Sequence, residues 1–292
     1  MRFTCAGPIA SGRRPSLALP VDSCDSHCHV LGPLERFPYA PEAERTYTPP
    51  EAPIEQIEAA WELLGITRGV IVQSVTHGND HSAVIDALRR GGGRFRGVAL
   101  VSPETAGTEI AGLDSQGFCG ARLNFMPDRS PVVSREEALQ IAAMIREFDW
   151  HVAFHTAGNG VAEHEDLIRA IPTRVVIDHM GRVVLRDGLR SPAIVALKRL
   201  LDLGNVWVKL SGADRIAGAP PSMDDGFELA RILAEHAPER VVWGSDYPHV
   251  NTSGFVPDDA DLVDGLQVVA PTSQALQRIL VDNPTECFGF AN

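Results

Sequence analysis

The sequence lacks the features that mark several classes of protein. It has no continuous run that approaches the roughly 18 apolar residues of a membrane-spanning helix. Its five cysteines are scattered and form no CxxC pair, which indicates free thiols in a reducing compartment. The first twenty residues carry arginines but no continuous apolar segment after them, so a secretory signal peptide is not predicted. We therefore expect a cytoplasmic protein.

Positive charge is also in short supply. Lysine and arginine together number 26 against 38 aspartates and glutamates, which gives a formal net charge of -12. Nucleic acids and anionic membranes bind basic surfaces, so neither is an expected partner. A small anionic substrate is not excluded, because it experiences only the local field of its pocket. The sequence leaves open whether the chain forms a homo-oligomer.

Short β-branched runs alternate with amphipathic helical patterns along most of the chain. Eight strands separated by helices, in 292 residues, favour a single-domain (β/α)8 TIM barrel of the α/β class. An open doubly wound sheet is the alternative, but LGP at 31–33 is not the glycine-rich turn expected after its first strand. The predicted strands cover 25–30, 69–74, 96–101, 120–125, 151–156, 174–180, 206–211 and 240–246, and the helical patterns cover 54–65, 81–90, 135–148, 193–204 and 227–239.

The predicted organisation has two parts. Residues 1–20 are expected to form an extended N-terminal arm, and residues 21–292 the barrel. The proline-rich stretch from Pro33 to Pro53 is too long for a bare connection between a strand and a helix. It is therefore predicted to be an irregular loop over the barrel mouth.

The stretch CDSHCHVLG places Asp25, His27 and His29 at alternate positions of the first predicted strand. Successive strand residues point to opposite faces, so these three side chains are expected to point the same way. In a barrel of this kind, active-site residues lie at the C-terminal ends of the strands. The polar residues expected at those ends are His27, His29, Ser74, Thr76, His77, Arg122, Asn124, His155, Asp178, His179, Arg182, Lys209, Ser211 and Asp246.

Four of these residues form a possible metal site. His27, His29, His155 and Asp246 would supply three imidazoles and one carboxylate, a donor set suited to one divalent ion such as Zn²⁺. A hydrogen-bonded cluster without metal is the alternative. Asp246 could take a proton from a water molecule as a general base, and His179 could hold that water or polarise a carbonyl.

The fourth predicted strand argues against a second metal ion. It offers Arg122 and Asn124 where a binuclear centre would need a bridging lysine or glutamate. The expected site is therefore mononuclear.

Several motifs carry a family resemblance that covers nearly the whole chain after about residue 20. HCH at 27–29, His155, DHMGR at 178–182 and WGSDYPH at 243–249 resemble the amidohydrolase superfamily. Within it, the chain resembles the 2-pyrone-4,6-dicarboxylate lactonases through ERFPYAPEAERTYTPP (35–50), VIVQSVTHGND (70–80), ARLNF (121–125) and LVDNP (280–284).

The resemblance implies hydrolysis of a carboxylated lactone in the degradation of aromatic compounds. It implies that Asp246 is the base that activates water, and that His27, His29 and His179 polarise the lactone carbonyl. Guanidinium groups suit the carboxylates of such a substrate because each can bind one in a bidentate manner. The substrate-binding residues implied in this way are Tyr47, Arg122, Arg129, Arg182, Arg215 and Asn251, and His77 is a further candidate.

The chain departs from the lactonases in two places. It has His155 where they carry a tyrosine, and histidine there resembles the metal-dependent relatives, which include nonoxidative decarboxylases. The segment from Arg122 to Arg129 is one residue longer than in the lactonases, which suggests a related muconolactone-type ring. The alternatives to a lactonase are a metal-dependent nonoxidative decarboxylase, a sugar-acid lactone isomerase and a carboxylate-binding protein without catalytic activity.

Overall fold

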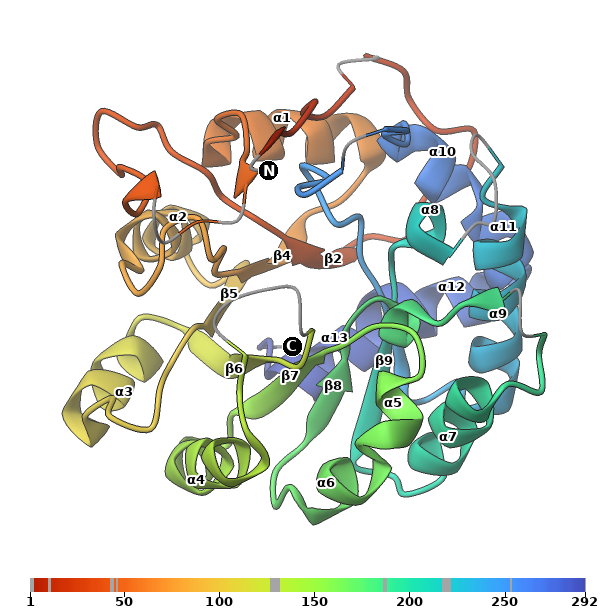
Figure 1. The fold of residues 1–292 in the computed structure, drawn as a ribbon. Coiled ribbons are helices and arrows are strands. Elements are labelled where there is room, and N and C mark those ends of the chain that lie inside the picture. Colours follow the sequence, from red (N-terminus) through yellow and green to blue (C-terminus); the bar gives the residue numbers. More distant parts are fainter. Residues whose placement is uncertain are drawn as a thin grey trace.

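Eight parallel strands form one sheet at the centre of the molecule, in the order β10-β9-β8-β7-β6-β5-β4-β2. The computed structural model describes residues 3–9, 12–42, 45, 47–126, 132–185, 188–216, 222–252 and 254–291. Helices surround the strands (Figure 1). The strands are β2 (Cys24–Cys28), β4 (Arg68–Val72), β5 (Phe95–Ala99), β6 (Phe118–Asn124), β7 (His151–His155), β8 (Val175–Ile177), β9 (Val206–Leu210) and β10 (Val241–Trp243).

The sheet closes between its two outer strands, β2 and β10. Cys28 forms a parallel bridge with Tyr247, just after β10. The Asp246 amide donates to the His27 carbonyl at 2.9 Å, and the His29 amide donates to the Tyr247 carbonyl at 2.8 Å. The predicted (β/α)8 barrel is therefore confirmed, and its closing contact involves three candidate site residues.

All eight strands end before their predicted last residue, and two of them end three residues early, the largest difference. The run predicted over 174–180 leaves the sheet after Ile177, where Asp178–Arg182 forms a tight turn. The run predicted over 240–246 leaves it after Trp243. In both places residues that follow the strand line a pocket, namely His179 and Arg182 after β8 and Asp246 after β10.

The five predicted helices are present, and further short ones join them. Each predicted helix buries an apolar stripe against the strands, as its periodicity requires. The short helices have too few turns for a clear periodic pattern, which is why the sequence did not reveal them. The predicted ones are α1 (Ile54–Leu64), α2 (Ser82–Gly91), α4 (Arg135–Ile145), α7 (Pro192–Leu201) and α9 (Asp224–His236), and the others are α3 (Gly107–Ser115), α5 (Gly160–Glu163), α6 (Glu165–Ala170), α8 (Ala213–Ile216), α10 (Asp259–Asp264), α11 (Leu266–Val269), α12 (Ser273–Gln277) and α13 (Asn283–Phe288).

Helix α1 shows how the outer layer is fixed to the barrel. Its Trp61 packs over Gly69 of β4 so closely that a Cβ at Gly69 would lie 2.1 Å from the indole ring. The indole Nε1 donates to Asp25 of β2 at 3.1 Å, and Ser245 Oγ donates to the same carboxylate oxygen at 2.5 Å. One buried carboxylate therefore links the helix layer to both strands at the closing seam.

The N-terminal segment lies against the barrel through specific contacts. Strand β1 (Phe3–Thr4) pairs in parallel with β3 (Tyr47–Thr48), which lies in the predicted proline-rich loop. Arg13 forms ion pairs with Asp261 and Asp264 of α10. The division of the chain at residue 20 stays a prediction. None of the described helices combines the length and apolar character needed to cross a membrane.

Apolar side chains fill the barrel below the site. Phe288, at the end of α13, plugs the N-terminal end and is 2 % exposed. The residues that form this inner core are Cys24, Val70, Val72, Val98, Ala153, Val176, Trp207, Val242, Cys287, Phe288 and Phe290. A closed base of this kind confines access from solvent to the opposite end of the barrel.

The plug should be a major source of stability. Phe288→Ala is expected to lower the free energy of unfolding by about 3–5 kcal/mol, because it removes a buried ring and leaves a cavity. Val268→Ala is the control, since Val268 is 49 % exposed, and should change the free energy by less than about 0.5 kcal/mol. Denaturant unfolding measures both, and equal effects would contradict the role of the plug.

Candidate active site

A bulge in β2 decides which side chains enter the site. The register between β2 and β4 shifts between Asp25 and Cys28. As a result Asp25 faces outward to Trp61 of α1, whereas His27 and His29 face the barrel interior. The expectation that all three side chains share one face is therefore wrong. Bulges beside active sites commonly re-aim a side chain in this way, and a single sequence does not reveal them.

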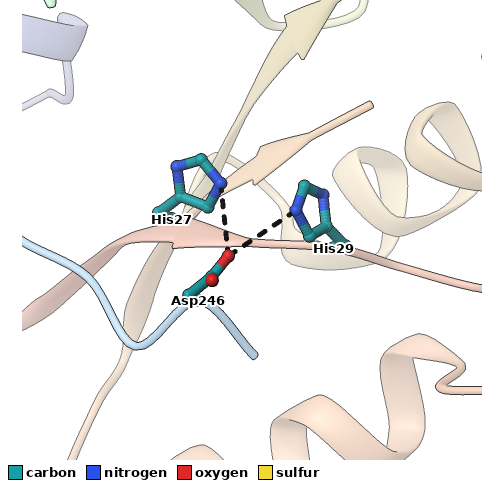
Figure 2. Close-up of side chains that lie close together, drawn as sticks. All are labelled: His27, His29 and Asp246. Carbon is teal, nitrogen blue, oxygen red and sulfur yellow. Dashed lines mark ion pairs between the residues drawn. The ribbon is translucent and has the colours of Figure 1, made fainter. Parts of the chain in front are cut away.

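The Oδ1 atom of Asp246 is the centre of the site. Three imidazole nitrogens surround it: Nε2 of His27 at 3.7 Å, Nε2 of His29 at 3.8 Å and Nε2 of His179 at 3.8 Å. Figure 2 shows the first two pairs, with His27 on β2, His29 directly after β2 and Asp246 on the segment after β10. All four side chains are nearly or fully buried. The three histidines predicted to act with Asp246 are thus brought together.

The other oxygen of Asp246 is held by Arg215 of helix α8. The guanidinium donates to Oδ2 from Nη2 at 2.7 Å and from Nε at 3.1 Å, and Nη2 also donates to the Val250 carbonyl at 3.1 Å. Burial alone would raise the pKa of the Asp246 carboxyl, but the polar groups around it, with the Arg215 guanidinium bound to Oδ2, outweigh burial and hold that pKa well below its usual range. Asp246 is therefore ionised, with one oxygen fixed and the other directed at the histidines.

The protonation of His29 can be assigned from its contacts. Its Nδ1 lies 2.7 Å from the Val72 carbonyl oxygen, so Nδ1 carries the hydrogen and donates it. Burial, followed by His27 and Arg122, lowers the pKa of His29 to about 3. The ring is therefore neutral, and its Nε2 presents a lone pair toward Asp246.

The turn after β8 positions His179 and Arg182. Its four residues from His179 to Arg182 all have positive φ, at 53°, 51°, 68° and 44°. Only Gly181 adopts this conformation without strain, and such strain is typical of functional sites. His179 Nδ1 lies 2.9 Å from Ser211 Oγ, and burial lowers the pKa of His179 well below its usual value.

Asp178, Lys209 and Arg122 form a buried charge cluster beneath the histidines. Lys209 Nζ lies 3.1 Å from Asp178 Oδ1, and Arg122 Nε lies 3.2 Å from Asp178 Oδ2. Burial favours the neutral acid, but Lys209, together with Arg122, outweighs it and keeps the pKa of Asp178 well below its usual range. Lys209 and Asp178 were expected at strand ends but received no role from the sequence, because a charged residue on a strand does not reveal its partner.

A pocket opens above Asp246 at the C-terminal ends of the strands. Its wall contains tyrosine, arginine, asparagine and histidine, the types of side chain that the resemblance implied for binding a carboxylated substrate. Tyr47 reaches it from β3, although most of the residues come from strand ends and the turns after them. The lining residues are His29, Tyr47, Val75, Leu100, Arg122, Asn124, His155, His179, Arg182, Arg215, Asp246 and Val250.

Three candidate substrate-binding residues are not among those lining residues. His77 lies under the proline-rich loop, where its Nδ1 is 3.2 Å from the Pro38 carbonyl oxygen. The backbone N–H of Asn251 donates to Cys5 Sγ of the N-terminal segment at 3.1 Å. Arg129 lies outside the described residues. His77 and Asn251 are therefore not part of the wall of the pocket.

Two buried groups of side chains could hold a metal ion. In each group the ligand atoms lie within 4.8 Å of one another. Both groups contain His27, so that residue is central to any metal site. The groups are His27, His29 and Asp246, and His27, Asp178 and His179.

The predicted four-ligand site does not fit the contacts of these residues. His155 belongs to neither group, although it lines the same pocket. Lys209 Nζ lies 3.1 Å from His27 Nδ1 in a hydrogen bond that requires a lone pair on Nδ1. The hydrogen of the neutral ring is then on Nε2, the nitrogen that would have to coordinate the ion. His27, as it is held by Lys209, therefore does not suit coordination of a divalent ion through Nε2.

Comparison with known proteins places the chain in a defined group. The amidohydrolase family model matches residues 24–290. The chain is 37 % identical to a 2-pyrone-4,6-dicarboxylate hydrolase of Comamonas testosteroni, over 96 % of this chain and 94 % of that protein. It is 39 % identical to a 4-sulfomuconolactone hydrolase of Rhizobium radiobacter, over 98 % and 96 %.

Two further similarities extend the comparison. A D-galactarolactone isomerase of Agrobacterium fabrum is 30 % identical, over 95 % of this chain and 94 % of that protein. The crystal structure of a probable 2-pyrone-4,6-dicarboxylic acid hydrolase from Acinetobacter baumannii, with citric acid bound, superimposes with a TM-score of 0.77 at 26 % identity. That alignment covers 92 % of this chain and all of the other.

Proposed function

The chain belongs to the amidohydrolase family, and we propose that it is a lactonase that opens a carboxylated lactone ring by adding water. The substrate class is 2-pyrone-4,6-dicarboxylate or a muconolactone-type lactone. Relatives that hydrolyse such lactones match almost the whole chain at 37–39 % identity, which supports this proposal.

The arrangement around Asp246 is the observation that carries the proposal. Its Oδ1 faces three neutral imidazoles within 3.8 Å, while Arg215 holds Oδ2. A water molecule in this space would give a proton to Oδ1, and its oxygen would bond to the lactone carbonyl carbon. The ring C–O bond then breaks, and the proton on Asp246 passes to the released ring oxygen. The products of this step are a carboxylic acid and a hydroxyl group.

The cationic wall of the pocket supports a carboxylated substrate. Arg122 and Arg182 both line it, and guanidinium groups bind carboxylates strongly in a bidentate manner. Arg122 is anchored from below by Asp178, so its position does not depend on the substrate. Arg215 was expected to bind substrate, but in this structure its guanidinium is paired with Asp246. We assign it the task of keeping Asp246 ionised and oriented.

Two alternatives predict different products. A galactarolactone-type isomerase would return a rearranged lactone with no water added, and a nonoxidative decarboxylase would release carbon dioxide. The isomerase relative matches at 30 % identity, below the two hydrolases. The ionised Asp246 with an unshared oxygen favours the activation of water.

Asp246→Asn tests the assignment of the base. The amide cannot accept the proton of water, so hydrolysis of the lactone is expected to fall by at least about 10²-fold. Asp261→Asn on the exposed face of α10 is the matched control and should hydrolyse the lactone at the normal rate. Near-normal turnover by folded Asp246→Asn would refute the role of Asp246.

Arg122→Met tests the recognition of carboxylates. The variant should raise KM for carboxylated lactones far more than for neutral ones, because it removes a positive charge from the pocket wall. The neutral lactone serves as an internal control for any general disturbance of the site. A similar change in KM for both kinds of lactone would show that Arg122 does not bind a carboxylate.

Metal analysis with and without chelator tests the expected divalent ion, Zn²⁺ at His27, His29, His155 and Asp246. Since His27 presents an N–H to the site, the purified protein should keep its activity in excess chelator. Loss of activity in chelator, with recovery on addition of Zn²⁺, would instead restore the four-ligand site predicted from the sequence.

A further inference from the structure

Lys209 is a buried basic residue to which the proposed reaction gives no task. It is one of only two lysines in the chain and is 0 % exposed. It lies on β9 inside the barrel, where its Nζ is 6.0 Å from the centre of the Phe288 ring that plugs the base. A buried lysine is costly to maintain, so its contacts call for a physical explanation.

Two acceptors share the Lys209 side chain. Its Nζ lies 3.1 Å from His27 Nδ1 and 3.1 Å from Asp178 Oδ1. A lysine ammonium has hydrogens to donate and no lone pair to accept one. His27 Nδ1 must therefore present a lone pair to Lys209.

The hydrogen of His27 is consequently on its other nitrogen. Because Nδ1 accepts a hydrogen bond from the Lys209 ammonium, it carries no hydrogen, and the ring holds its single N–H hydrogen on Nε2. Its Nε2 is buried and has no hydrogen-bond partner among the described residues. Asp246 Oδ1 is 3.7 Å away, beyond hydrogen-bond distance. The N–H of His27 therefore faces the space between the histidines and Asp246.

His29 presents the opposite group to the same space. Its Nδ1 donates to the Val72 carbonyl, so its Nε2 carries a lone pair. The ring centres of His27 and His29 are 5.1 Å apart, at an interplanar angle of 88°. Two neighbouring imidazoles thus offer one donor and one acceptor, and the difference arises from what each Nδ1 contacts.

We propose that Lys209 is a positioning residue that holds His27 in the tautomer with its hydrogen on Nε2. In this form His27 donates to the lactone carbonyl oxygen as negative charge develops there. His29 was expected to polarise the same carbonyl, but its Nε2 has no hydrogen to donate, so it accepts a hydrogen bond from the attacking water while Asp246 takes the proton. The assignment to a carbonyl oxygen rests on the proposed lactonase function. The tautomer itself follows from the contacts of Lys209.

Asp178 is the competitor that makes Lys209 necessary. Its Oδ1 lies 3.4 Å from His27 Nδ1 and would accept a hydrogen from that nitrogen if Lys209 were absent. Removal of Lys209 should therefore move the hydrogen from Nε2 to Nδ1. His27 would then direct a lone pair toward the carbonyl oxygen and repel the developing charge.

The experiment compares Lys209→Met with Asp178→Asn. Both variants break the same buried ion pair, but only Lys209→Met removes the donor to His27 Nδ1. Nitrogen-15 NMR of protein labelled at histidine reports which ring nitrogen carries the hydrogen, and a His27→Gln spectrum assigns the His27 signals. We expect hydrogen on Nε2 in the wild type and in Asp178→Asn, and on Nδ1 in Lys209→Met.

Kinetics with a carboxylated lactone provide the second readout. Lys209→Met should lower kcat by about 10²-fold, as loss of an oxyanion donor does, with little change in KM. A hydrogen on Nδ1 of His27 in the wild type would overturn the proposal, and so would Lys209→Met with hydrogen still on Nε2. A moved hydrogen with unchanged kcat would overturn the role in catalysis.

The two proposals fail separately. The NMR measurement uses no substrate, so it decides the tautomer even if no lactone is hydrolysed. A wild-type protein inactive on every lactone would refute the proposed function alone. If Lys209→Met does not fold, the wild-type and Asp178→Asn spectra still decide whether His27 Nδ1 accepts a hydrogen bond from Lys209.

Discussion

The closing contact of the barrel is the constraint on which the site depends. The backbone of Asp246 and Tyr247 pairs with that of His27 and His29, and these hydrogen bonds join the two outer strands. The same residues carry the side chains of the candidate centre. The general base and two histidines are therefore held in place by the interaction that completes the fold, and loosening the seam would separate the reacting groups.

Around this seam, each charged side chain is held by a partner of opposite sign. Arg215 fixes one oxygen of Asp246, and Lys209 and Arg122 fix both oxygens of Asp178. These ion pairs keep both carboxylates ionised while burial keeps the histidines neutral. Although the formal net charge of the chain is -12, the wall of the pocket carries Arg122 and Arg182 in addition to Arg215, which is paired with Asp246. This local surplus of guanidinium groups is what an anionic lactone requires.

Much of the fold could be predicted because it follows from repeated local patterns. All eight strands were located from β-branched runs, and His27, His29, His179 and Asp246 from their places at strand ends. Three features could not be predicted from the sequence, each for a physical reason. The β2 bulge turns Asp25 outward by a register shift that alternation cannot reveal. The left-handed turn at His179 depends on surrounding packing, and the pairing of Lys209 with His27 joins residues on strands far apart in the sequence.

The destination of the water oxygen tests the central claim most directly. A single turnover of a carboxylated lactone, with enzyme in excess in ¹⁸O-labelled water, separates direct attack by water from other routes. Asp246 acting as a base predicts one ¹⁸O atom in the new carboxylate of the product and none in Asp246. An unlabelled product, with ¹⁸O in the Asp246 carboxylate or in no carboxylate at all, would contradict it.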